Sequence, residues 1–104
     1  MDVIETQTSR ENQFIKLVQK HYPKVQVQRM VNGLYFLTPD RLFHPSQSMF
    51  RVHKKNQEAW LFRDGIWVPI DIYVYNEEFF ALAQTIGKEY TEATNQPVRI
   101  IKEF

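Results

Sequence analysis

The stretch from Met49 to Tyr75 constrains the fold of this chain more than any other part of it. It contains both tryptophans and the densest run of β-branched and aromatic residues, which are the residue types enriched in strands. Inside it, Asp64-Gly65 separates two apolar runs. An Asp-Gly pair suits a two-residue type I′ turn, which needs positive φ at both central residues. We therefore predict antiparallel strands on either side of this pair.

The start of the stretch shows the alternation of a strand with two different faces. Phe50 and Val52 fall on one face, and Arg51 and His53 fall on the other. Further on, Pro69 has no N–H for a ladder, so it marks an edge, a bulge or a break between two strand segments.

A second hairpin is predicted nearer the N-terminus. Residues 24–31 alternate, Asn32-Gly33 is another pair suited to a type I′ turn, and the apolar residues 34–37 form the partner strand.

Two amphipathic helices are expected, one before and one after these strands. Thr8 and Glu11 have capping-box spacing, and Pro23 ends the first helix. Asn76 is the predicted N-cap of the second helix, which either ends at Gly87 or continues to Asn95. Residues 98–102 form the last strand. The apolar stripes of the helices are Phe14, Leu17, Val18 and His21 in the first, and Phe79, Leu82, Ala83, Ile86 and Tyr90 in the second.

Together these segments predict an α+β fold with the order α-β-β-β-β-β-α-β. We expect a single antiparallel-dominated sheet of about five to six strands, with one N-terminal and one C-terminal helix, because tight turns join most strands. Residues 1–7 are predicted to be a flexible tail and residues 8–104 a single domain. With 104 residues and 43% hydrophobic residues, the chain is large enough to bury a core without a metal or a disulfide.

Composition narrows the function classes. The chain has no cysteine, which excludes disulfides and cysteine nucleophiles and fits a reducing compartment, so a cytoplasmic location is expected. The polar N-terminus lacks the pattern of a secretory signal, and no apolar run is long enough to suggest a membrane partner. The net charge is +1, far from the basic stripe of a dedicated nucleic-acid binder.

No catalytic template is present. There is no G-x-S-x-G, no glycine-rich phosphate loop and no H-E-x-x-H, so no catalytic residue, metal ligand or cofactor is predicted. His21 suits a helix C-terminus, and Glu77 and Glu78 suit the first turn of a helix. Asp71 interrupts an apolar run, and it either points to solvent by alternation, which we expect, or is buried with a raised pKa.

One group of residues suggests a binding surface. Basic side chains lie near both tryptophans in sequence, and the predicted binding residues are Arg41, Arg51, His53, Lys54, Lys55, Arg63 and Trp67. Tryptophan and arginine are favoured anchors of protein interfaces, whereas cations beside rings also describe a platform for single-stranded nucleic acid. A third interpretation is that the tryptophans belong to the core and the charges to a solvated face.

From these observations we expect a small non-catalytic protein-binding module of the inhibitor, immunity or adaptor type, acting through an aromatic and basic sheet face. The alternative is a domain that binds single-stranded nucleic acid through the face that runs from Arg51 to Lys55. If Phe50 and Val52 face the core, Arg51 and His53 should emerge on the opposite, exposed face.

Overall fold

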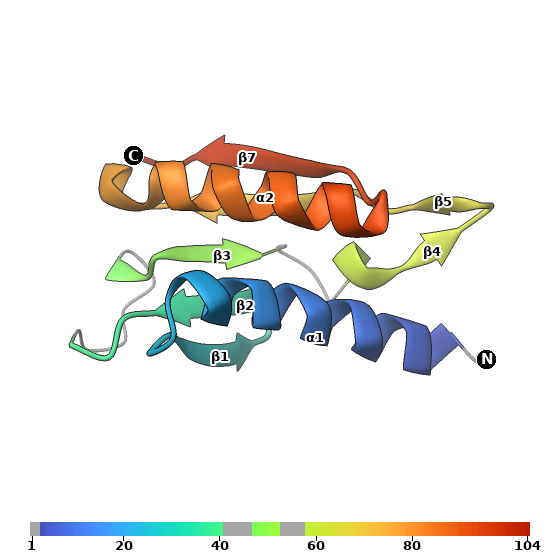
Figure 1. Cartoon of the computed structure of the whole chain (residues 1–104), viewed down its shortest axis with the longest axis horizontal. Coiled ribbons are helices and arrows are strands. Elements are labelled where there is room, and N and C mark those ends of the chain that lie inside the picture. Colours follow the sequence, from blue (N-terminus) through green and yellow to red (C-terminus); the bar gives the residue numbers. More distant parts are fainter. Residues whose placement is uncertain (1–2, 41–46, 53–57) are drawn as a thin grey trace.

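The computed structural model describes residues 3–40, 47–52 and 58–104. In this part of the chain, two helices lie against a five-stranded sheet, and a separate two-stranded hairpin extends from it (Figure 1). The helices are α1 (Val3–His21) and α2 (Phe80–Thr94). The strands of the main sheet are β1 (Gln26–Met30), β2 (Gly33–Leu37), β3 (Phe50–Val52), β6 (Ile70–Val74) and β7 (Val98–Lys102). The hairpin is formed by β4 (Phe62–Arg63) and β5 (Ile66–Trp67), and two short 3-10 turns are η2 (Glu58–Trp60) and η3 (Glu77–Phe79).

The main sheet has the strand order β1-β2-β3-β6-β7 and is antiparallel except for the last pair. β6 and β7 run parallel because α2 connects them, and a parallel pair needs such a crossover. The predicted α+β fold is therefore confirmed. Its sheet is divided, however, since Pro69 separates β5 from β6 and the β4–β5 hairpin forms a sheet of its own.

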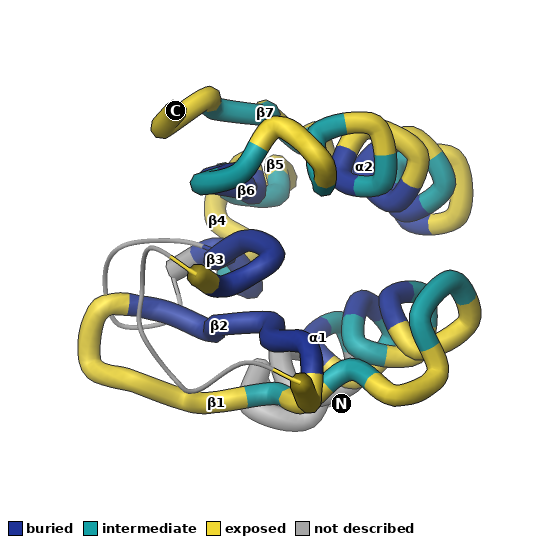
Figure 2. Tube along the Cα trace, turned by 90° about the vertical axis from the view of Figure 1, so that its left-hand side faces the viewer, coloured by how far each residue is buried: buried dark blue, intermediate teal, exposed yellow. Residues whose placement is uncertain are grey.

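Both helices cover the same face of the main sheet, as Figure 2 shows in a view along the strands. The core fills the space between the helices and the sheet. Phe14 from α1 lies at its centre, with ring centroids 5.6 Å from Phe36, 5.7 Å from Trp60 and 5.3 Å from Tyr90. The predicted helix stripes face this core: Phe14, Val18, Ala83, Ile86 and Tyr90 are buried, while Leu17, Phe79 and Leu82 pack against it.

The first helix begins earlier than predicted. α1 starts at Val3, so Thr8 lies inside the helix and is not its N-cap. The segment before Thr8 contains no proline or glycine to stop the helix, and this explains the difference. The proposed mobility of residues 1–7 stays a prediction.

The second helix also starts differently, because the η3 turn precedes it. The Asn76 side chain makes no capping hydrogen bond and instead donates to the Ser48 carbonyl at 3.4 Å. α2 continues through Gly87 to Thr94 and ends at Asn95, which adopts the left-handed conformation (φ 62°).

One of the two predicted turns is confirmed and the other is shifted by one residue. Asp64 and Gly65 have φ of 52° and 79° and join Arg63 to its partner Ile66, as a type I′ turn requires. In the first hairpin Met30 pairs with Gly33, so residues 31–32 form the turn and Gly33 begins β2 with a φ of 143°. Glycine tolerates that positive φ without strain.

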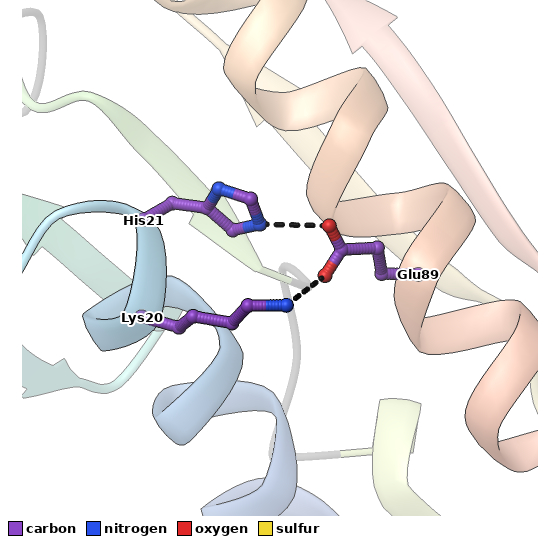
Figure 3. Close-up of polar contacts among 3 residues, drawn as sticks. All are labelled: Lys20, His21 and Glu89. Carbon is purple, nitrogen blue, oxygen red and sulfur yellow. Dashed lines mark hydrogen bonds and ion pairs between the residues drawn. The ribbon is translucent and has the colours of Figure 1, made fainter.

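A polar contact joins the two helices, between the last turn of α1 and the middle of α2. Lys20 and His21, in the last turn of α1, contact the carboxylate of Glu89 on α2 at 3.4 and 2.9 Å (Figure 3). His21 therefore has a structural partner in addition to the favourable α1 C-terminus. No helix among the described residues is both long enough and apolar enough to cross a membrane.

Candidate functional site

The structure does not bring the predicted binding residues together on one exposed sheet face. Arg63 and Trp67 both lie on the β4–β5 hairpin, whereas Arg51 lies on β3 in the main sheet. Arg41, His53, Lys54 and Lys55 lie outside the described residues. Of the predicted binding residues that the structure describes, only Arg63 and Trp67 thus lie together, and they lie on the hairpin.

Arg51 is a correction, because it was expected to be exposed and is only 8% exposed. The alternation itself is right, since Arg51 lies on the face opposite Phe50 and Val52. Its two register partners on the neighbouring strands are Tyr35 and Tyr73, so tyrosines flank it on both sides. Arg51 is buried because β3 lies between β2 and β6, and this strand order cannot be predicted from the sequence of β3 alone.

The guanidinium group of Arg51 lies among three tyrosine rings. Its Nη1 donates a hydrogen bond of 3.2 Å to the Tyr35 hydroxyl group, and its Cζ lies 5.7, 4.8 and 5.6 Å from the ring centroids of Tyr35, Tyr73 and Tyr75. Such cation–π contacts gain strength when water is excluded. Arg51 therefore acts as a structural residue on the sheet face that the helices do not cover.

Two of these tyrosines are held in the protonated form. Burial raises the pKa of Tyr73 and of Tyr75, and the nearby positive charge of Arg51 only partly offsets this effect. Both hydroxyl groups are therefore neutral at physiological pH, and neither supplies a phenolate to pair with Arg51.

The β4–β5 hairpin, by contrast, presents apolar side chains to solvent. Phe62 is 48% exposed and Ile66 is 69% exposed, and the hairpin extends past the ends of α2 and β7 (Figure 1). Arg63 beside them is also exposed, and Trp67 is half-buried. We call Phe62, Arg63, Ile66 and Trp67 the hairpin surface.

The apolar side chains occupy both faces of this short ribbon. Phe62 pairs with Trp67 on one face, where their ring centroids are 4.9 Å apart, and Arg63 pairs with Ile66 on the other. An isolated two-stranded hairpin is at best marginally stable in water. The position of this one must therefore depend on contacts with the rest of the molecule.

Arg10 of α1 provides the first of these contacts. Its guanidinium carbon lies 4.4 Å from the centroid of the Trp67 ring, and its Nη1 donates to the Thr94 carbonyl at 3.3 Å. This arginine therefore links the hairpin to α1 and to the end of α2.

Gln96 provides the second contact, at the base of the hairpin. It is fully buried, and its side-chain amide donates to the carbonyl of Ala59 and, at 2.8 Å, to that of Val68. These two carbonyls belong to the segments that enter and leave the hairpin. Val68 N–H also donates to the Leu61 carbonyl at 2.9 Å, which closes the base of the ribbon. The hairpin is thus positioned on a fixed base while its tip remains exposed.

Sequence reasoning missed several residues of this site. Phe62 and Ile66 were assigned to strands but not to the binding surface, although the short two-sided apolar ribbon around Asp64-Gly65 was a usable signal. Arg10 and Gln96 are far from the hairpin in sequence, and no local pattern identifies them.

Asp71, expected to face solvent, is half-buried and forms a bidentate ion pair with Arg99 at 2.6 and 2.8 Å.

Comparisons with protein-family models, with curated proteins and with solved structures find no match to this chain. Among the described residues, no group of three or more His, Asp or Glu side chains is placed to hold a metal ion.

Proposed function

We propose that this protein is a non-catalytic protein-binding module whose contact surface is the β4–β5 hairpin. The observation that supports this proposal most is the exposure of Phe62 and Ile66 on a ribbon that Gln96 fixes to the core. Exposed apolar groups on a positioned element lose little conformational entropy when a partner covers them. Inhibitors, immunity proteins and adaptors are the class of small domain that acts in this way.

The composition of the hairpin surface supports a protein partner. Tryptophan and arginine are enriched among the residues that contribute most binding energy at protein interfaces, and both are present in Trp67 and Arg63. Apolar side chains at the tip supply the area that a partner would remove from water.

Single-stranded nucleic acid is supported less well. That alternative needs exposed cations to contact phosphates, and Arg51, the first residue of the proposed face, is buried among tyrosines. The hairpin surface contributes Arg63 as its only cation.

A photo-crosslinking experiment tests the proposal. A photoreactive benzoylphenylalanine is incorporated at the position of Ile66 in one protein and at the position of Val31 in another, and both are irradiated in the native lysate. Val31 is a matched control, because it is 90% exposed and lies at the turn between β1 and β2. We expect a protein adduct from position 66 alone that persists after nuclease treatment. Equal adducts at both positions, adducts that disappear with nuclease, or none at position 66 would contradict the proposal.

A further inference from the structure

The outer edge of the main sheet beside α2 carries a second inference, independent of the hairpin. β7 is the last strand of the sheet, and within the described residues no other strand pairs with its outer side. The Ile70 N–H donates to the Pro97 carbonyl at 2.9 Å, and the Glu103 N–H donates to the Val74 carbonyl at 2.8 Å. Because backbone groups alternate along a strand, those of Val98, Ile100 and Lys102 point away from β6.

A groove runs beside this open edge. It has a volume of about 350 Å³ and lies between α2 and β7, where Val98 and Ile100 form one wall. Gly87 lies at its base, and a Cβ atom there would come within 3.0 Å of the Val98 side chain and 3.3 Å of that of Ile100. The glycine therefore permits close packing of helix and strand.

The combination of these two features suits an added strand. An extended peptide that pairs with a sheet edge gains main-chain hydrogen bonds, and every second side chain of it points to the same face. The groove lies on the face of β7 that is turned toward α2. The residues of an added strand opposite Val98, Ile100 and Lys102 would therefore place their side chains in or beside the groove.

The charges around the groove indicate which strand it accepts. α2 and β7 run in opposite directions, since a short turn joins them (Figure 1). Glu92 consequently lies toward the start of β7, whereas Lys88, one helical turn earlier, lies closer to its end. Lys102 ends the strand, with its Nζ 4.8 Å from the Phe80 ring centroid. The groove is thus acidic at one end and basic at the other.

We propose that this groove binds an extended segment of a partner protein by strand addition to β7. The segment runs antiparallel to β7, the slightly more stable pairing. Its helix-facing residues are, in order, an acidic residue near Lys88 and Lys102, an aliphatic residue opposite Ile100 and a basic residue near Glu92.

Synthetic peptides test this inference directly. One carries the core Glu-Thr-Val-Thr-Lys, and its matched control carries the charge-reversed core Lys-Thr-Val-Thr-Glu. We expect the first peptide to bind the wild-type protein about tenfold more tightly, as two exposed ion pairs allow. In a nuclear magnetic resonance titration, the backbone amides of Val98, Ile100 and Lys102 should show the largest shifts.

A charge-exchanged protein supplies the reciprocal test. Lys88→Glu combined with Glu92→Lys keeps the net charge and alters only exposed side chains of α2, so the fold should be retained. This variant should prefer the charge-reversed peptide. Equal affinity of both peptides, no binding of either, an unchanged preference in the variant, or shifts that map to the hairpin would overturn the proposal.

Backbone methylation separates strand addition from simple insertion of a side chain. N-methylation of the central valine removes the N–H that faces Ile100 and should abolish binding, whereas N-methylation of a neighbouring threonine should be tolerated. If both methylated peptides bind as well as the parent, main-chain pairing is excluded.

Discussion

The hydroxyl group of Tyr90 donates a hydrogen bond of 2.8 Å to the side-chain oxygen of Gln96, and both residues are fully buried. This bond fixes the orientation of the Gln96 amide, because its oxygen is occupied by Tyr90 and its nitrogen must face the opposite way. The nitrogen then reaches the carbonyls of Ala59 and Val68 at the base of the hairpin. Burial raises the pKa of Tyr90 well above its usual range, so this donor stays protonated.

Replacing Gln96 should therefore loosen the hairpin. Gln96→Leu removes the donor to the buried Ala59 carbonyl and to the partly buried Val68 carbonyl, which should cost roughly 2–4 kcal/mol in the free energy of unfolding. Chemical denaturation measures this loss, and hydrogen exchange at the Val68 amide should become faster. The exposed Gln84→Leu is the control and should change stability by less than about 0.5 kcal/mol. Equal stability of the two variants would show that the Gln96 contacts do not support the fold.

Arg51 should behave as a structural residue. Arg51→Ala removes the hydrogen bond to Tyr35 and the packing against three rings, and we expect it to destabilise the protein by about 2 kcal/mol. Arg63→Ala, at an exposed position on the hairpin, should change stability by less than about 0.5 kcal/mol. The free energy of unfolding of both variants is measured in urea. If Arg51→Ala leaves it unchanged, the contacts of Arg51 with the tyrosines do not stabilise the fold.

Because of the helix–helix contact at Glu89, the free energy of unfolding should fall as the solution becomes acidic. Desolvation opposes ionisation of Glu89, but the hydrogen bonds and charges of His21 and Lys20 outweigh it and lower its pKa. A carboxyl whose pKa is lower in the folded state contributes stability above its unfolded pKa. That contribution is lost as the pH falls through the folded pKa.

The matching experiment compares urea midpoints of wild type and Glu89→Gln between neutral pH and pH values below the ordinary pKa of a glutamate, about 4.3. Wild type should be the more stable protein at neutral pH, and the difference should shrink as the pH falls. Glu92→Gln, on the exposed side of the same helix, serves as the control. A difference that stays constant with pH would show that Glu89 does not couple folding to protonation.

Much of the fold could be predicted because its signals are local. The Asp64-Gly65 turn, the apolar stripe from Phe14 to Val18 and the last strand at residues 98–102 each depend on neighbouring residues, and the structure has all three. The predicted helix starts differ from the observed ones. At Thr8 a capping-box pattern was present, but nothing before it stopped the helix.

The surroundings of the proposed binding residues were harder to predict because burial depends on strand order. Arg51 has the pattern of an exposed cation, and only the pairing of β3 with β2 and β6 surrounds it with tyrosines. Likewise, Phe62 and Ile66 resemble core residues in sequence. They are exposed because the hairpin leaves the main sheet before Pro69 and forms a two-stranded sheet of its own.

The proposed binding function of the hairpin is tested most directly by titrating the partner captured at position 66 against the wild-type protein and two double variants. Phe62→Ala combined with Ile66→Ala removes the exposed apolar groups of the hairpin. Met30→Ala combined with Val31→Ala removes groups of the same kind, 46% and 90% exposed, from the other hairpin. We predict that the first pair weakens binding by more than about tenfold, or roughly 1.4 kcal/mol, and that the second pair leaves it unchanged. Equal affinity of all three folded proteins would contradict the hairpin as the contact surface.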